Sequence, residues 1–246
     1  MGEERELLAA KLWDCLKISL GRPCFLGFLD ESEAAYCQDR LRRERGGHLF
    51  WGGYEGAQRV IAGFFPDYLD PDPAAFPLSA VTLRYRPEDK LGHRDFLGSF
   101  MGLGVQRDVV GDILVGEGRT VAFVRAELCG FFINNVKKIG RVGVKIQAGW
   151  EEPLPEALHF KELGGVVASD RLDCLVGLLV HASRGKAAGL ISAGQVLVNH
   201  REALELSRKV QEGDVVSVRG HGKFIIDRLG PLTGKGRLNV KCRKYQ

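Results

Sequence analysis

The residues most suited to chemistry in this chain are cations at the start of a predicted C-terminal helix. Arg184 and Lys186 follow Ser183, whose hydroxyl can cap the helix by accepting a backbone N–H. A helix N-terminus is partly positive, so two added cations favour a phosphate there. The pattern predicts contact with an RNA backbone, where counterion release supplies much of the affinity. Further residues predicted to support this contact are Arg171, Asn199, Arg201, Arg219 and Lys223.

Asp173 is a second candidate for chemistry in the same segment. Arg171-Leu172-Asp173 resembles the surroundings of the catalytic aspartate in pseudouridine synthases, but the strand that carries it in those enzymes is absent. We expect Asp173 to anchor the first turn of its helix or to orient Arg171. No catalytic residue is predicted.

His93-Arg94-Asp95 has the letters of a protein-kinase catalytic loop. That motif needs an Asn five residues after the Asp to hold magnesium, and the position is Phe100. We therefore reject a kinase. His93, Arg94 and Arg107 are instead candidate RNA contacts, and the alternative is that the acidic residue caps a helix while Arg94 is exposed.

A glycine-rich segment, Gly52-Gly53-Tyr54-Glu55-Gly56, leaves two interpretations open. Consecutive glycines before a helix can cradle an anion. They are equally suited to close packing and positive φ angles. No metal, nucleotide or other cofactor motif is present, so no cofactor and no metal site are predicted.

The elements that must position the C-terminal cations are two short helices and a set of strands. Apolar spacing predicts a helix over 171–179, a tight turn, and a helix over 184–191 that ends before Gly194. Alternating residues predict strands at 195–199, 215–219, 223–227 and 237–241. Residues 150–165 are expected to be a linker or an additional edge strand.

The middle of the chain has the pattern of a ferredoxin-like (RRM-like) fold. The expected elements follow the order β-α-β-β-α-β, at residues 80–85, 93–102, 112–115, 120–124, 126–139 and 142–146. The third strand carries Phe123, where an RNA-recognition motif would present several exposed aromatic residues. Base stacking on this sheet, a structural role and a protein-contact surface therefore all stay open.

The N-terminal part is predicted to be helical. Leucines at helical spacing predict a first helix to Leu20, a second helix runs to Arg45, and a third ends at Phe65 before a proline-rich linker. The predicted division is a helical domain at 1–75, a ferredoxin-like domain at 76–150 and an RNA-binding domain at 165–246. The fold class is α+β.

Composition and charge favour a polyanion binder. Of 246 residues 45% are hydrophobic and 27% charged, which is typical of a globular protein. From Ser169 onward there are 14 basic and 7 acidic residues, whereas the preceding chain has a net charge of −3. The six cysteines show no C-x-x-C pair, so we expect reduced, buried thiols and no zinc. The acidic start and the lack of a long apolar run predict a cytoplasmic protein without a membrane segment.

A stretch of some fifty residues in the C-terminal part of the chain, from Arg171 to Gly220, closely resembles the S-four domain, also called the αL motif. The matching positions are Arg171-Leu172-Asp173, Ser183-Arg184, Leu190-Ile191, Gly194, Val196, Val198-Asn199, Val210, Gly213-Asp214 and Val218-Arg219-Gly220. His200 departs from the pattern, because many members have Gly there. The resemblance implies a module that binds structured RNA.

The upstream chain resembles the YlmH family of S-four proteins, which has relatives in cyanobacteria and plastids. The similar segments are Gly52 to Arg59, Phe64-Phe65-Pro66, His93 to Ser99, Met101 to Gly104 and Gly111-Asp112-Ile113. The family implies a cytosolic factor that binds ribosomal and transfer RNA on the large ribosomal subunit, in quality control of stalled translation.

We therefore expect a non-catalytic RNA-binding monomer whose partners are rRNA, tRNA and the large ribosomal subunit. The alternative is an RNA-modifying enzyme, of the pseudouridine synthase or methyltransferase type, in which the S-four domain delivers a catalytic body. A third reading, compatible with the first, is an adaptor whose acidic N-terminal body binds a protein.

Overall fold

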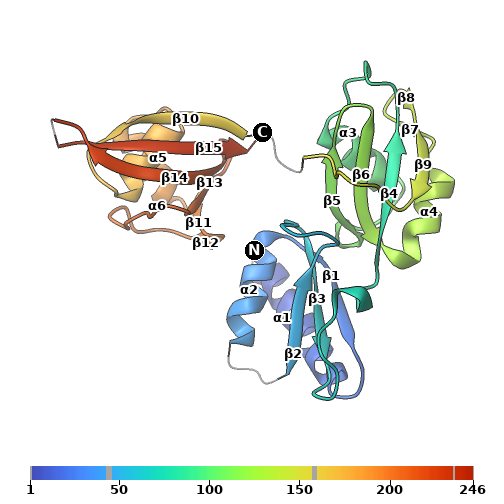
Figure 1. Cartoon of the computed structure of the whole chain (residues 1–246). Coiled ribbons are helices and arrows are strands. Elements are labelled where there is room, and N and C mark those ends of the chain that lie inside the picture. The colour runs from blue at the N-terminus through green and yellow to red at the C-terminus, as the bar shows by residue number, and fades with distance from the viewer. Residues whose placement is uncertain (1, 43–45, 157–159, 235, 246) are drawn as a thin grey trace. The chain divides into compact units, whose positions relative to one another are not determined.

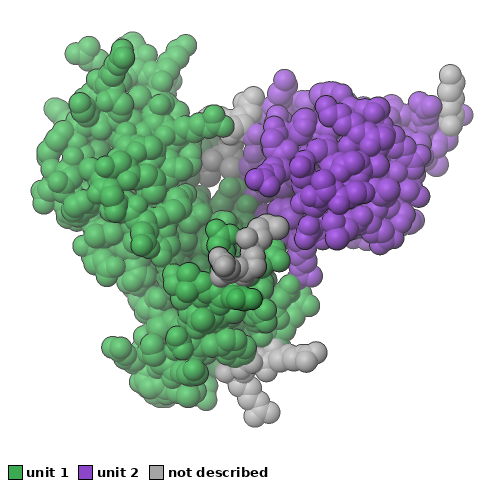
Figure 2. Space-filling view, turned by 180° about the vertical axis from the view of Figure 1, so that it is seen from behind, with its two compact units in different colours: residues 1–157 green, residues 158–246 purple. Residues whose placement is uncertain are grey.

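The computed structural model describes residues 2–42, 46–156, 160–234 and 236–245 (Figure 1). Its internal contacts divide the chain into two compact units, residues 1–157 and 158–246 (Figure 2). No single described helix is long and apolar enough to span a bilayer. Two helices, α5 (Leu172–Leu179) and α6 (Arg184–Ser192), are long and apolar enough only when taken together, and they are bent by 109° relative to each other.

The first unit begins with a three-stranded antiparallel sheet of order β1-β3-β2 and two helices. The elements are α1 (Gly2–Ser19), β1 (Cys24–Leu29), α2 (Glu31–Leu41), β2 (Gly47–Trp51), β3 (Val60–Phe65) and the 3-10 turn η1 (Pro73–Ala75). The first two predicted helices are therefore confirmed, whereas the predicted third helix, ending at Phe65, is wrong, and the N-terminal part is not a purely helical domain. Arg45, the predicted end of the second helix, lies outside the described residues.

Strand β3 explains why a helix was predicted where the chain is extended. Ala62 and Phe64 pack into one core cluster, whereas Ile61 and Phe65 pack into another. A strand buried on both faces reads as a continuous apolar run and loses the alternation that identifies a half-buried strand.

Two cysteines differ from the expectation of reduced thiols. Cys15 in α1 and Cys24 at the start of β1 form a disulfide, with Cα atoms 5.5 Å apart. The chain reverses after α1, which then packs against β1, so residues nine apart in sequence meet. Cys37, Cys129, Cys174 and Cys242 are free thiols.

The second part of this unit has the element order β-α-β-β-α-β, with a small hairpin inserted before the last strand. The elements are β4 (Leu78–Arg84), α3 (His93–Met101), η2 (Arg107–Val109), β5 (Val110–Val115), β6 (Arg119–Arg125), η3 (Ala126–Leu128), α4 (Cys129–Asn135), β7 (Lys138–Ile139), β8 (Val142–Gly143) and β9 (Lys145–Ala148). The sheet is antiparallel, in the order β5-β6-β4-β9. The predicted helix over 126–139 is shorter because β7 begins at Lys138.

Both faces of this four-stranded sheet are covered. On one face Val81, Leu83 and Ala122 pack with residues of α3 and α4. On the other, Phe123 is 1% exposed, and its ring stacks on Tyr54 with centroids 5.1 Å apart. The sheet face that base stacking would need is thus buried against the N-terminal part of the same unit, and that interpretation is wrong.

The glycine-rich segment lies at this covered face and serves close packing. A Cβ on Gly52 would lie 2.4 Å from the Arg59 carbonyl oxygen, and one on Gly53 would lie 2.3 Å from the Phe123 ring. Gly53 also has φ of +104°, a conformation that side chains rarely adopt. The geometry favours the packing interpretation over an anion cradle.

We expect Gly53→Ala to lower the free energy of unfolding of the first unit by about 3 kcal/mol, because it combines backbone strain with overpacking. Gly56→Ala is the matched control, since Gly56 has φ of +84° but nothing within 4 Å of an added Cβ. It should cost only the backbone strain, about 1 kcal/mol. All three tryptophans lie in this unit, so urea denaturation followed by tryptophan fluorescence reports on it. Equal losses in the two variants would contradict the clash.

The second unit is a six-stranded antiparallel sheet with two helices packed on one face (Figure 1). Its elements are β10 (Phe160–Val167), α5 (Leu172–Leu179), α6 (Arg184–Ser192), β11 (Val196–Val198), β12 (Arg201–Glu202), β13 (Val215–Val218), β14 (Gly222–Leu232) and β15 (Leu238–Tyr245). The strand order is β10-β15-β14-β13-β11-β12. Residues 150–165 thus include an added edge strand, the second of the two alternatives considered.

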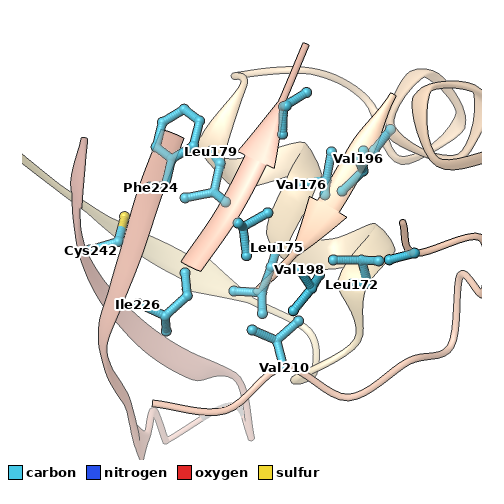
Figure 3. Packing of buried hydrophobic residues seen from close by; sticks show 14 of the residues in the cluster. Leu172, Leu175, Val176, Leu179, Val196, Val198, Val210, Phe224, Ile226 and Cys242 are labelled. Carbon is cyan, nitrogen blue, oxygen red and sulfur yellow. The ribbon is translucent and has the colours of Figure 1, made fainter. Parts of the chain in front are cut away.

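Strand alternation decides which side chains enter the core of this unit (Figure 3). Phe224 and Ile226 of β14 are buried against Leu175 and Val176 of α5. Each such side chain contributes about 1.5–3 kcal/mol on removal from water. Lys223 and Ile225 alternate with these two core residues along β14. Their side chains therefore belong to the opposite face of the sheet, here called the outer sheet face.

Candidate nucleic-acid interface

The predicted cations near Ser183 are placed by the tight turn between α5 and α6. His181 has φ of +51°, and the Ala182 N–H donates to the Gly177 carbonyl at 2.9 Å. Ser183 then caps α6, since its hydroxyl accepts the Lys186 N–H at 3.3 Å. The predicted N-cap is confirmed.

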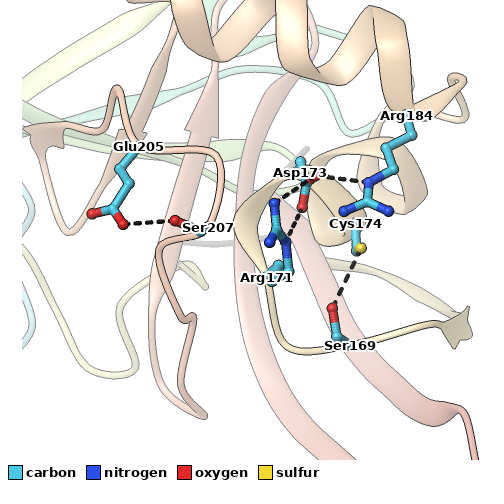
Figure 4. Close-up of polar contacts among 7 residues, drawn as sticks. All are labelled: Ser169, Arg171, Asp173, Cys174, Arg184, Glu205 and Ser207. Carbon is cyan, nitrogen blue, oxygen red and sulfur yellow. Dashed lines mark hydrogen bonds and ion pairs between the residues drawn. The ribbon is translucent and has the colours of Figure 1, made fainter.

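A buried carboxylate at the start of α5 holds two arginines (Figure 4). Asp173 is 3% exposed. Arg184 donates from Nε to Asp173 Oδ2 at 2.7 Å, and Arg171 donates from Nε to Oδ1 at 3.1 Å and from Nη2 to Oδ2 at 3.3 Å. The expectation that Asp173 orients Arg171 is confirmed, and it orients Arg184 as well.

The balance of forces keeps Asp173 ionised. Burial by itself would raise the pKa of Asp173, but the hydrogen bonds and charges of Arg171 and Arg184 outweigh it and lower the pKa to about 2. The same contact raises the pKa of Arg184. The ionised Asp173 carboxylate lies between two positively charged guanidinium groups and therefore holds Arg171 and Arg184 in position.

Arg184 keeps most of its binding capacity for a ligand. Its side chain is 60% exposed, and Asp173 engages only Nε. Within the described part of the chain, neither Nη1 nor Nη2 has a hydrogen-bond partner. Lys186 is exposed, and a Cβ added to Gly185 would meet nothing within 4 Å, so an anion can approach the first turn of α6 closely.

The ion pairs predict how the stability of the second unit depends on pH. The folded pKa of Asp173 lies below its ordinary value of 3.8, so the stabilisation is full above pH 5 and is lost as pH falls toward 2. We expect wild type to lose about 2 kcal/mol more over this range than Asp173→Asn, which has no charge to lose. Calorimetry at stepped pH measures this, with tryptophan fluorescence identifying the transition of the first unit. Parallel pH slopes in the two proteins would contradict it.

The other predicted contacts of this unit do not all lie together. The Arg219 N–H donates to the Gln195 carbonyl at 2.9 Å, just beyond the end of α6 that lies opposite Lys186. Arg201 is in the edge strand β12, next to β11. Lys223 lies on the outer sheet face, with its ammonium 4.5 Å from the centre of the Tyr245 ring.

Asn199 has a structural role in this geometry. It has φ of +50°, its Nδ2 donates to Asp214 Oδ1 at 2.7 Å, and its Oδ1 accepts the Val215 N–H at 2.9 Å. The amide thus closes the turn after β11 and is already engaged. His200, with φ of +64°, completes this turn.

The candidate contacts in the middle of the chain, His93, Arg94 and Arg107, all belong to the first unit. The Arg107 guanidinium points inward and donates to the carbonyls of Val110 and Gly111, and burial followed by the nearby Arg59 charge lowers its pKa to about 10. Partial burial and then Arg107 lower the pKa of His93. Arg94 is exposed. Arg107 is therefore engaged by the protein, whereas Arg94 stays available to a ligand.

Sequence reasoning missed two cations beside Arg171. The Leu172 N–H donates to the Arg208 carbonyl at 2.8 Å, and Lys209 pairs in a β-bridge with Arg171. The Lys209 ammonium is also 3.4 Å from Asp170. These residues lie more than thirty positions after α5 begins, in a segment without regular structure, so no local pattern signalled them.

Comparisons with known proteins identify two family models, one relative and one solved structure that are similar to this chain. The family model described as "Putative RNA-binding domain in YlmH" matches residues 71–151, and the S4 (S-four) domain model matches residues 170–216. A relative from Bacillus subtilis (strain 168), named "Ribosome-associated protein quality control protein P2", is 30% identical over 221 residues, which are 89% of this chain and 86% of the relative. A solved structure described as "Cell division protein ylmH from Streptococcus pneumoniae" has 23% identity and a TM-score of 0.48, over 59% of this chain and 87% of that one.

The fold and the site together define an α+β protein with antiparallel sheets and a C-terminal S4 domain. The chain belongs to the YlmH family. Among the described residues, no group of three or more His, Cys, Asp or Glu side chains could hold a metal ion.

Proposed function

We propose that this chain is a non-catalytic factor that binds structured ribosomal and transfer RNA on the large ribosomal subunit, during quality control of stalled translation. The observation that carries the proposal is the arginine fork of Arg184, held by buried Asp173 beside the open N-terminus of α6. Two exposed cations at a helix N-terminus suit the phosphates of an RNA backbone. The name of the Bacillus subtilis relative supports the ribosomal setting.

The first unit is proposed to be a mainly structural body of a cytoplasmic protein. We propose a ferredoxin-like fold for residues 76–150, with its sheet covered on both faces. Contacts with RNA from this part would then come from exposed side chains such as Arg94, outside the sheet. The N-terminal part supplies the cover and a candidate surface for a protein partner.

A binding role fits the chemistry of Asp173 better than catalysis does. A catalytic aspartate must reach a substrate, whereas both carboxylate oxygens of Asp173 accept hydrogen bonds from arginines and the side chain is 3% exposed. The RNA-modifying alternative gains no support from this residue.

Sedimentation of a bacterial lysate through a sucrose gradient tests the proposed function. The full chain should travel with free large subunits at low salt. High salt should return it to the top of the gradient, because salt weakens contacts between protein cations and the phosphates of the RNA backbone. A chain that stays at the top at low salt, while purified transfer RNA and large subunits fail to bind it, would overturn the proposal.

A further inference from the structure

The second unit contains a hollow of about 300 Å³ beside Arg184. Its walls come from the end of β10, from one side of α5 and from the turn before α6. We call it the Arg184 pocket, and its lining includes Val166, Cys174, Leu178, Ala182 and Arg184.

The walls of the Arg184 pocket expose polar and apolar surface in about equal parts. Val166 borders the hollow at the edge of β10, but its side chain alternates with that of buried Val167 and therefore belongs to the outer sheet face. Cys174 and Leu178 of α5 are half-buried, pack against the core and supply apolar surface to the wall of the hollow. Exposed apolar surface in a concave site favours a ligand with an apolar face. A hollow near the lower end of the usual range for ligand sites, about 300–1,000 Å³, suits one ring system.

The polar end of the pocket selects an anion. The Asp173 carboxylate is already satisfied by two arginines and is 3% exposed, so the pocket offers no open carboxylate to a cation. Arg184 instead presents Nη1 and Nη2, which have no partner in the described ranges. A ligand with an anionic group at one end and a flat ring next to it would satisfy both parts of the pocket.

The backbone of β10 adds hydrogen-bonding groups to the same wall. This strand is at the edge of the sheet and, among the described strands, pairs with β15 alone. Every second residue of an edge strand directs its N–H and C=O away from the sheet. Such groups at the end of β10 can pair with the polar edge of a ring that lies against Leu178.

We propose that the Arg184 pocket receives the base of one unpaired nucleotide, while the phosphate of that nucleotide binds Arg184. Bases inside a duplex are stacked and cannot enter a hollow, whereas an unpaired base can turn outward. The inference rests on the proposed function and deepens it, because it adds a preference for RNA with an unpaired nucleotide to general backbone binding.

The test compares two RNA stems of the same sequence, one fully paired and one with a single unpaired adenosine. Wild type should bind the stem with the adenosine about tenfold more tightly, the usual effect of one stacked base. Cys174→Phe fills the pocket, and its affinities for the two stems should agree within about twofold. Cys174→Ser is the matched control, because it leaves the hollow open and should keep the preference.

A second measurement works without filling the pocket. In a Cys129→Ser background, Cys174 is the remaining free thiol that is not buried. A bound base should slow alkylation of Cys174 by about tenfold at saturating RNA with the adenosine, and by less than about twofold with the paired stem. This holds even if Cys174→Phe does not fold.

The outcomes separate the two proposals. Equal affinity for both stems, or equal protection of Cys174, would overturn the pocket while leaving RNA binding intact. Failure of both stems and of large subunits to bind would overturn the proposed function and the pocket with it.

Discussion

Replacing Arg184 and Lys186 together by glutamate is expected to lower the affinity of the chain for large ribosomal subunits about a hundredfold, which corresponds to about 2.7 kcal/mol. Both side chains are exposed at the first turn of α6, where the helix dipole also favours a phosphate. The two glutamates would remove both attractive contacts and repel the same phosphates. Equilibrium binding of fluorescently labelled chain to purified subunits measures the change.

A matched control separates this face from net charge. Arg228→Glu with Lys241→Glu makes the same change in charge at exposed residues that pair across β14 and β15 on the outer sheet face. The affinity of this control should fall by less than about tenfold, because long-range attraction is screened by salt. An equal loss in the two double variants would show that binding follows net charge alone.

Salt dependence gives an independent measure of the same contacts. Arg184→Gln with Lys186→Gln removes two charges without adding repulsion, so the slope of log affinity against log salt should fall by about 2. Melting curves must show that Arg184→Gln leaves the second unit folded, because Asp173 then loses one of its two partners. A folded variant with an unchanged slope would exclude the α6 face as the phosphate site.

The part of this site that could be predicted is the part encoded locally. Ser183, Arg184 and Lys186 occupy one helix turn, and the order cap, cation, cation is visible within four residues of sequence. The contact of Arg184 with Asp173 spans eleven residues and depends on the turn at His181. This contact could be identified only from the structure, because no local sequence pattern predicts the angle between α5 and α6.

The sheet face on which Lys223 lies is predictable from the sequence alone. Phe224 and Ile226 alternate with Lys223 and Ile225, so if the aromatic residue enters the core, the lysine must lie on the other face. The grouping of Lys223 with the α6 cations was therefore excluded by period alone. In β3 the period was absent because tertiary contacts bury both faces, and only the fold could correct that prediction.

Asp112→Ala is expected to have the largest effect on stability, a loss of about 4 kcal/mol from the first unit. Asp112 is 9% exposed and lies at the joint between the N-terminal and middle parts. It accepts hydrogen bonds from the Tyr54 hydroxyl at 2.8 Å and from the N–H groups of Gln58 at 2.7 Å and Arg59 at 3.1 Å. Removal of the carboxylate would leave three partly buried donors without an acceptor.

The hydrogen bonds of Tyr54 and the position of Arg59 at this joint also depend on the Asp112 carboxylate. Burial and then the charge of Asp112 raise the pKa of Tyr54, so its hydroxyl stays protonated and remains a donor. Arg59 continues the network by donating to the Val110 and Phe28 carbonyls at 3.2 and 2.8 Å. One acidic side chain thus orders the glycine-rich segment and the arginine that follows it.

Urea denaturation followed by tryptophan fluorescence tests this prediction, because Trp13, Trp51 and Trp150 all belong to the first unit. Asp112→Asn keeps one acceptor oxygen but presents an N–H₂ group to donors, so it should lose about half as much as Asp112→Ala. Glu88→Ala, at an exposed position in the same unit, should stay within about 0.5 kcal/mol of wild type. If Asp112→Ala unfolds at the wild-type urea concentration, the hydrogen bonds at this joint do not hold the two sheets together, and the apolar contacts around Phe123 must do so without them.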